Sequence, residues 1–485
     1  MIFNAIKNQP KENVAIRTLS SSFSYGDLLN NIELIEAWLI ANNVTSLALY
    51  CENQPEWVFI DLACQKAGVI FTAIPPFFSD AQIDTLIGSV KPDVIISKFE
   101  LSFYQAIPFP LVLLSAYRLN LISVAKTPIN TTKVTFTSGS TGSPKGVCLS
   151  SKNQQEVASS LVKAINIEAP THLCLLSLST LLENVAGIYA PLLAGGSVWL
   201  LNSDEVGFDG ANLLSAKKFL NAISITKPQT IILVPELLQL LLMGVKQGWQ
   251  PPVELEFIAV GGSKVSHRLI EQARNSGLAV YQGYGLSECG SVVSIANRGD
   301  ASSHSCGQIL SHLSLSVQGK ELVVKGNAFL GYINDENSWY PTAVKTGDLA
   351  EISNNSLEIK GRMKNLIINS FGRNISPEWV ESELLATGLF KQMVVIGDSR
   401  PFCIAIATLQ TGITDETANQ MLAQVNLTLP TFAQVEELII LKQDMNFEQG
   451  LITSNGRPKR QAIEKFFHQK IENIYQQTSN QLEIS

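Results

Sequence analysis

The sequence carries little charge, and this scarcity excludes some functions before any motif is considered. Charged residues make up 16% of the chain, and the formal net charge is −7. Proteins that bind nucleic acid usually present a strongly basic surface, so we do not expect nucleic acid as a partner. Because 46% of the 485 residues are hydrophobic, we expect a globular protein with large buried layers and more than one domain.

Cysteine and histidine are too few and too scattered to suggest disulfides or zinc. The seven cysteines are odd in number and contain no C-x-x-C pair. This is typical of a reducing compartment, so we expect a cytoplasmic protein. None of the five histidines stands at the spacing from a cysteine that zinc motifs use, so a structural zinc site is not expected.

Long apolar runs are missing as well. Residues 1–10 lack the basic region and apolar core of a signal peptide. The most apolar later run, 230–245, contains Pro235, Glu236 and Gln239, and is too short and too polar to span a bilayer. It predicts a buried strand followed by a helix. We expect no transmembrane segment, although peripheral membrane contact is compatible with a lipid substrate.

The most distinctive segment is 135–146, with the sequence TFTSGSTGSPKG. Its glycines let the backbone approach an anion closely, and successive backbone N–H groups can then surround phosphate oxygens. Its hydroxyls and Lys145 add hydrogen bonds and a positive charge. It differs from the common phosphate loop, because its lysine follows a proline and precedes no Ser or Thr. The flanking residues 133–136 and 147–149 favour β-structure, so they predict a strand–loop–strand unit. A plain surface turn would not require so many glycine, serine and threonine residues together.

Short apolar runs alternate with helix-like runs through the first two-thirds of the chain. We expect strands at 46–50, 69–74, 93–97, 173–178, 198–201, 230–234 and 257–260, and helices at 55–67, 79–86, 181–193 and 236–245. Continuous apolar strands between helices predict parallel sheets covered on both faces, here two stacked α/β layers built from about 1–160 and 161–285.

The composition changes twice after these layers. Residues 291–357 predict a small β unit, and the part after Gly361 predicts a compact α+β unit with strands at 393–396 and 404–409 and a helix at 460–475. The expected fold class is α/β. It comprises a large N-terminal domain at 1–361, with two α/β layers and a small β unit, and a small, mobile α+β C-terminal domain at 362–485.

Five further motifs are ambiguous when taken singly. They are 259–263 (AVGGS), 284–288 (YGLSE), 345–348 (KTGD), 361–367 (GRMKNLI) and 453–460 (TSNGRPKR). Plain interpretations exist for each: a core tyrosine, a helix-start acid, tight turns, a surface arginine or a solvated basic loop. The YGLSE motif follows an apolar strand, and the carboxyl ends of parallel strands are where open α/β sheets bind ligands. A carboxylate in the KTGD turn would accept both hydroxyls of a ribose.

The order and spacing of these motifs, from about Ala15 to Phe467, resemble the adenylate-forming superfamily of acyl-CoA synthetases, luciferases and peptide-synthetase adenylation domains. The resemblance implies that ATP and Mg²⁺ activate a small carboxylic acid as an acyl-adenylate. CoA, or the phosphopantetheine of a carrier protein, then displaces AMP. It also implies a C-terminal domain that swings between the two half-reactions.

The resemblance also implies roles for individual residues. It assigns nucleotide binding to Thr137, Ser138, Gly139, Ser140, Thr141, Gly142, Lys145, Gly261, Gly262, Ser263, Tyr284, Gly285, Ser287, Asp348 and Arg362. Ser138, Ser140, Thr141 and Lys145 would hold the departing phosphates, Tyr284 would stack on adenine, and Asp348 would hold the ribose. The catalytic group would comprise Lys145, Ser287, Glu288 and Arg457, with Glu288 as the Mg²⁺ ligand and Lys364 as the hinge.

Arg457 departs from the family pattern. The family usually has a lysine here, which bridges the acid's carboxylate and the α-phosphate. Arginine keeps the charge but is larger and forked, so it is not equivalent. Lys459 lies two residues further on, but Gly456 and Arg460 keep the family's register and favour Arg457.

Residues 176–187 match the family region that begins the acyl pocket, with Thr180, Glu183, Asn184 and Gly187 as its candidate residues. No aspartate stands between Leu175 and Gly196 to hold an amino group, so the segment favours an aliphatic or aryl acid over an amino acid. It loosely resembles long-chain acyl-CoA synthetases. The alternative is that its leucines are simply helix core.

Three functions follow from these observations. The first is a fatty or similar acyl-CoA synthetase. The second is an acyl-AMP ligase that loads a carrier protein. The third, resting only on Arg457, is a catalytically attenuated nucleotide-binding protein.

Overall fold

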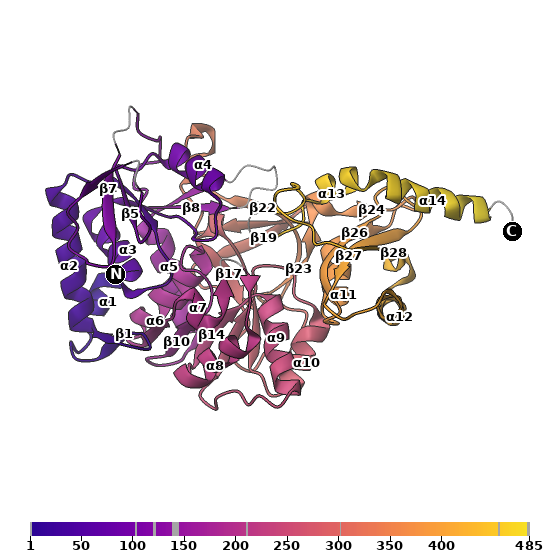
Figure 1. The fold of residues 1–485 in the computed structure, drawn as a ribbon, viewed down its shortest axis with the longest axis horizontal. Helices are drawn as coiled ribbons and strands as arrows, with labels where there is room; N and C mark the ends of the chain where they lie inside the picture. The colour runs from indigo at the N-terminus through magenta and orange to yellow at the C-terminus, as the bar shows by residue number, and fades with distance from the viewer. Residues whose placement is uncertain are drawn as a thin grey trace.

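A computed structural model describes residues 2–101, 104–119, 123–137, 145–209, 212–300, 302–453 and 456–482. The chain begins in a large body and ends in a smaller unit that projects from it (Figure 1). Two sheets with their covering helices build the large body, and a third sheet with further helices builds the small unit.

The first sheet has the strand order β21-β9-β8-β4-β3-β5-β7-β6. Its strands are β3 (Ser46–Tyr50), β4 (Ile70–Ala73), β5 (Val94–Ser97), β6 (Gln105–Ile107), β7 (Ser115–Arg118), β8 (Lys133–Thr137), β9 (Lys145–Leu149) and β21 (Gly331–Tyr332). The central strands β8, β4, β3 and β5 are parallel, and antiparallel strands close both edges. The expected strands of this layer are confirmed.

The second sheet has the strand order β19-β20-β22-β23-β18-β17-β16-β15-β14-β10-β11-β1-β2. Its strands up to β16 are β1 (Val14–Arg17), β2 (Ser22–Ser24), β10 (Thr171–Cys174), β11 (Ser197–Leu200), β14 (Thr230–Leu233), β15 (Phe257–Val260) and β16 (Val280–Leu286). The strands from β1 to β16 are parallel except for the β1–β2 pair.

The predicted small β unit is continuous with this second sheet. It contains β17 (Ser291–Ile295), β18 (Gln308–Ile309), β19 (Ser314–Gln318), β20 (Glu321–Lys325), β22 (Val344–Ser353) and β23 (Ser356–Arg362). Strand β16 joins the two parts, because it pairs in parallel with β15 and antiparallel with β17.

Helices cover the sheets of the large body. They are α1 (Ile2–Asn8), α2 (Tyr25–Ala41), α3 (Pro55–Ala67), α4 (Asp80–Val90), α5 (Ser151–Ile165), α6 (Ala190–Leu193), α7 (Ser203–Val206), α8 (Ala216–Thr226), α9 (Pro235–Lys246) and α10 (His267–Asn275). Ser79 is the N-cap residue of α4. The short elements are the π-helical turn η1 (Glu183–Tyr189), the 3₁₀ turns η2 (Ser287–Cys289) and η3 (Glu336–Ser338), and the hairpin β12 (Phe208–Asp209)–β13 (Asn212–Leu213).

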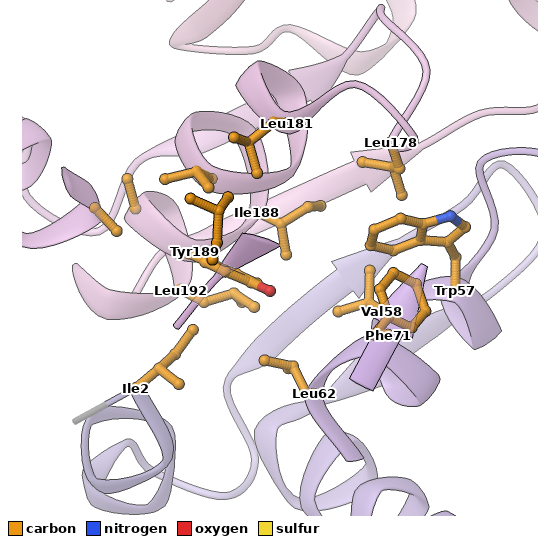
Figure 2. Packing of buried hydrophobic residues seen from close by; sticks show 14 of the residues in the cluster. Ile2, Trp57, Val58, Leu62, Phe71, Leu178, Leu181, Ile188, Tyr189 and Leu192 are labelled. Carbon is orange, nitrogen blue, oxygen red and sulfur yellow. The ribbon is translucent and has the colours of Figure 1, made fainter. Parts of the chain in front are cut away.

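The two layers pack against one another through a shared core. Figure 2 shows Trp57, Val58 and Leu62 of α3 facing Ile188 and Tyr189 of η1. All of these side chains belong to one buried cluster. The core therefore sits between the layers, and η1 is one of the elements that joins them.

The small unit contains the sheet β26 (Phe390–Ile396)–β27 (Cys403–Leu409)–β28 (Val435–Leu441). Its other elements are η4 (Met363–Asn365), the pair β24 (Ile367–Ile368) and β25 (Asn374–Ile375), α11 (Pro377–Leu385), α12 (Asp415–Asn426), η5 (Thr431–Ala433), α13 (Arg460–Phe466) and α14 (His468–Leu482). The small unit combines a three-stranded sheet with helices and has its own buried apolar clusters, so the expected α+β C-terminal unit is confirmed.

Several local predictions need correction. Strands β1 and β2 belong to the second sheet, although they precede the first in sequence. The predicted helix 181–193 contains a π-helical turn before its last α-helical turn. The predicted KTGD turn lies inside strand β22, and Tyr284 lies inside β16 instead of after it. Strand pairing decides three of these cases, because β1 pairs with β11, β16 with β17, and β22 with β20 and β23.

Candidate active site

One cavity of about 3190 Å³ runs between the large body and the small unit. Of the residues predicted to carry function, its walls contain Lys145, Thr180, Gly261, Gly262, Ser263, Tyr284, Gly285, Ser287, Glu288, Asp348, Arg362, Lys364 and Arg457. Motifs up to about 300 residues apart therefore meet around one space. Glu183, Asn184 and Gly187 are not among the lining residues.

The phosphate-loop motif lies at one edge of the first sheet. Strands β8 and β9 form an antiparallel pair that extends to Thr137 and Lys145, as the strand–loop–strand pattern predicts. Ser138, Gly139, Ser140, Thr141 and Gly142 lie outside the described residues, so their predicted contacts remain predictions.

Tyr332 connects Lys145 with Glu288. The Lys145 ammonium lies 4.8 Å from the centre of the Tyr332 ring, and the Tyr332 hydroxyl donates a 2.9 Å hydrogen bond to Glu288 Oε1. Strand β21, which carries Tyr332, pairs with β9 just after Lys145. No sequence motif marks Tyr332, because the pairing of β21 with β9 is what brings it to the site.

Asp348 is the centre of a second polar group. The residue is 3% exposed, and its carboxylate accepts hydrogen bonds from the Tyr284 hydroxyl at 2.6 Å and from Arg362 Nε at 2.8 Å. Burial raises the pKa of Asp348, and the Arg362 guanidinium opposes this rise. Burial next to this carboxylate also raises the pKa of Tyr284 well above its usual value. Each carboxylate oxygen has a further lone pair, so ribose hydroxyls can still be accepted.

Gly285 allows β16 to bend toward the cavity. The β16–β17 register shifts between Tyr284 and Gly285, and a Cβ on Gly285 would lie 1.7 Å from the Ser291 carbonyl oxygen. Only glycine fits such a close backbone approach. The bend is followed by η2, which brings Ser287 and Glu288 to the cavity wall.

Arg457 reaches from the small unit to the glycine turn of the large body. Its guanidinium donates a 2.5 Å hydrogen bond to the Gly262 carbonyl oxygen. Lys459 also lines the cavity, and its ammonium lies 5.6 Å from the centre of the Phe447 ring in the small unit. A second contact between the units joins Gln239 Nε2 to the Leu385 carbonyl oxygen at 3.0 Å. The small unit is therefore docked with Arg457 directed at the site.

The predicted acyl residues divide into two groups. Thr180 lines the cavity together with Leu181 and Leu182. Glu183 is fully buried, with its Oε1 3.0 Å from His172 Nε2. Burial raises the pKa of Glu183, and the hydrogen bond from His172 opposes the rise.

Asn184 belongs to a buried polar network. It donates to Asp61 Oδ2 at 3.0 Å and accepts from Lys133, which is 2.8 Å from Asp61 Oδ1. Tyr189 donates to the same carboxylate at 2.5 Å. This network ties α3, β8 and η1 together between the two layers and does not face the cavity.

The fold and the site define an AMP-binding enzyme. The model of the family described as "AMP-binding enzyme" matches residues 2–333, and that of the "AMP-binding enzyme C-terminal domain" matches 364–479. The chain belongs to this family.

Curated relatives are acid–CoA ligases of differing substrate. The long-chain-fatty-acid–CoA ligase FadD15 of Mycobacterium bovis is 29% identical over 250 residues, covering 44% of this chain and only 41% of that protein's own length. The 2-succinylbenzoate–CoA ligase of Staphylococcus epidermidis is 27% identical over 400 residues, covering 76% of this chain and 78% of that protein.

Solved structures share the fold. The O-succinylbenzoate coenzyme A synthetase of Bacillus subtilis, in complex with ATP and magnesium ion, superposes with a TM-score of 0.77 at 22% identity over 95% of this chain and 98% of that one. The anthranilate CoA ligase AuaEII, in complex with anthranoyl-AMP, has a TM-score of 0.78 at 16% identity, with 96% of each chain covered. Within the described ranges, none of the helices combines the length and apolarity needed to cross a bilayer.

Proposed function

We propose that this protein is an acid–CoA ligase that forms AMP and acts on an acid with an apolar acyl chain. The observation that carries the proposal is the cavity between the large body and the small unit. Its wall contains both the phosphate-side residues Lys145 and Glu288 and the apolar side chains of Leu181 and Leu182. Family membership and the CoA-ligase relatives support the same reaction class.

In the first step, an oxygen of the acid's carboxylate attacks the α-phosphorus of ATP. The new bond gives an acyl-adenylate, and the bond from the α-phosphorus to the β-phosphate oxygen breaks, so that pyrophosphate leaves. Lys145 and Arg457 supply positive charge where negative charge develops. Tyr284 lies against the base, Asp348 and Arg362 hold the ribose, and Ser287 lies next to the α-phosphate.

Glu288 fits the Mg²⁺ that this reaction uses, because carboxylate oxygens are ligands that Mg²⁺ prefers and Glu288 faces the same cavity as Lys145. Bound there, Mg²⁺ would neutralise charge on the phosphates. The Tyr332 hydroxyl, 2.9 Å from Glu288 Oε1, fixes the orientation of this carboxylate.

In the second step, the sulfur of CoA attacks the acyl carbon, a C–S bond forms, and AMP leaves as the C–O bond breaks. We propose that the boundary between the two domains lies between Gly361 and Arg362, and that Lys364 is the hinge. The contact of Arg457 with Gly262 belongs to the first step, because it directs a cation from the small unit toward the nucleotide side. The small unit then turns to admit CoA.

The test is an assay of AMP and pyrophosphate release with ATP, Mg²⁺ and a panel of fatty, aryl and amino acids, with and without CoA. We expect AMP release that requires both an apolar acid and CoA, with the acyl-CoA ester as product. Stimulation by amino acids alone would contradict the proposal. Pyrophosphate release without any CoA ester would indicate a carrier protein as the acceptor.

A further inference from the structure

Two residues that line the cavity, His172 and Cys174, belong to a buried group of side chains that the proposed reaction does not use. His172 and Cys174 lie two residues apart on β10, so they share one face of that strand. The π-helical turn η1 lies against β10 and adds Glu183. The exposed fractions are 1%, 0% and 0%, and one ligand atom from each residue lies within 4.8 Å of the other two.

Both ring nitrogens of His172 have a polar neighbour that fixes the orientation of the ring. Its Nδ1 lies 2.8 Å from the Thr230 hydroxyl oxygen, and its Nε2 lies 3.0 Å from Glu183 Oε1. Without a metal, Nε2–H donates to Glu183. Binding of an ion at Nε2 requires the ring proton to stand on Nδ1, which then donates to Thr230. A histidine that binds a metal usually has its other nitrogen held in this way.

Two observations describe the surroundings of these atoms. Among the described residues, no hydrogen bond to the buried Glu183 Oε2 meets standard geometry, although the Cys174 thiol and the Leu176 N–H lie close enough to lower the pKa of this carboxylate. Leaving a buried acceptor unpaired costs about 1–3 kcal/mol. In addition, a Cβ on Gly187 would lie 2.7 Å from both Glu183 Oε1 and His172 Nε2, so only glycine lets η1 approach these two atoms this closely.

The dimensions suit a zinc ion. Three atoms no more than 4.8 Å apart have a central point at most ~2.8 Å from each, and zinc bonds to N, O and S measure about 2.0–2.3 Å. Movements of the three ligand atoms by less than about 1 Å would therefore complete the bonds to the ion. Imidazole, thiolate and carboxylate form a donor set that zinc accepts, and the two anions neutralise the ion in a buried place.

We propose that His172, Cys174 and Glu183 bind one divalent ion of the zinc class, with Thr230 orienting the histidine. His172 and Cys174 line the cavity, so the fourth coordination position faces the cavity and takes water or a donor atom of a ligand. The site lies in the large body, and its existence does not depend on the proposed ligase activity.

The experiment uses the full chain, stripped with a chelator and kept reduced. Zn²⁺ is titrated in competition with a chromophoric chelator, and Co²⁺ is added separately to detect a sulfur-to-cobalt charge-transfer band. We expect one Zn²⁺ per chain and a clear thiolate band with Co²⁺. C174S should abolish the band, and H172Q and E183Q should each weaken Zn²⁺ binding at least ~10-fold. T230V, which removes only the orienting hydroxyl, should weaken it ~10- to 100-fold.

Controls separate this site from other ligands. C64S changes a cysteine that is also 0% exposed but lies outside the group, and should leave binding unchanged. H267Q/H304Q removes a histidine pair whose ring centres are 3.7 Å apart, and should also leave it unchanged. The proposal is overturned if Zn²⁺ does not bind, if Co²⁺ gives no thiolate band, or if binding survives C174S. Loss of binding in H267Q/H304Q alone would overturn it too. The wild-type Co²⁺ spectrum decides the question even if a variant does not fold.

Discussion

The Tyr284 hydroxyl lies 2.6 Å from Asp348 Oδ2, and the other oxygen of that carboxylate receives Arg362 Nε at 2.8 Å. Three strands, β16, β22 and β23, supply these residues, so the carboxylate is fixed before any nucleotide arrives. Preorganisation of this kind lowers the cost of binding.

Loss of the tyrosine hydroxyl should therefore weaken the use of ATP. Hydrogen bonds to charged groups contribute about 1.5–3 kcal/mol, so Y284F should raise the KM for ATP about 10- to 100-fold, and D348N should lower kcat/KM further. ATP–pyrophosphate exchange measures both effects. Y281F, on the same strand with its ring stacked 4.3 Å from Phe257, is the matched control and should remain near wild type. An unchanged KM in Y284F would contradict the assigned role of this pair.

Arg457 should matter for only one of the two half-reactions. R457A removes the cation that reaches Gly262 from the small unit, and we expect adenylation to fall about 10²- to 10³-fold. Conversion of a supplied acyl-adenylate to the CoA ester should change little. K459A is the control, since Lys459 lies over Phe447. Equal losses in both half-reactions would count against a role confined to the first step.

R457K tests attenuation directly, because a large gain in rate would mean that the natural arginine limits turnover.

The buried pair Lys133–Asp61 should respond strongly to the loss of one partner. Their side chains are only 5% and 1% exposed, and burial lowers the pKa of Lys133 while Asp61 opposes this. K133M leaves an uncompensated buried carboxylate and should lower the free energy of unfolding by about 3–5 kcal/mol. K133M/D61N should recover much of this loss. Denaturant titration gives the values. K218M, which breaks the exposed pair Lys218–Asp204, should cost less than about 1 kcal/mol, and an effect of that size in K133M would refute the prediction.

His312 should make the protein sensitive to acid. Burial lowers its pKa from 6.5 to about 4, and its Nδ1 is paired with the Ser160 hydroxyl at 2.8 Å. Between these pH values the unfolded chain binds the proton more readily than the folded chain does. The contribution of neutral His312 to the free energy of unfolding is therefore fully present above about pH 6.5, and it is lost as the pH drops toward 4. H312Q should flatten this part of the stability curve, measured as Tm between pH 7 and 4.5. H468Q, at an exposed position, should follow the wild type; identical curves for H312Q and wild type would exclude His312 as a cause.

Local sequence determined many elements of this protein. The ends of α3 and the positions of β3 and β15 follow from apolar runs bounded by helix- and turn-forming residues, and Ser79 and Ser376 precede helices as their capping tendency predicts. The order of the glycine-rich and acidic motifs was also sufficient to indicate the family, because phosphate and ribose chemistry restricts residue types within short segments.

Only the tertiary structure decided how distant segments meet. Strand β21 brings Tyr332 between Lys145 and Glu288, although it lies almost 190 residues after β9 in sequence. The π-helical turn directs Asn184 to Lys133 and Glu183 to His172, so two residues expected in the acyl pocket are buried in polar pairs instead. His172 and Cys174 lie on β10, whereas Glu183 lies on η1. The spacing of the histidine and the cysteine in sequence therefore gives no sign that the three side chains meet. Strand pairing and layer packing act between residues far apart in sequence, and local propensity carries no information about them.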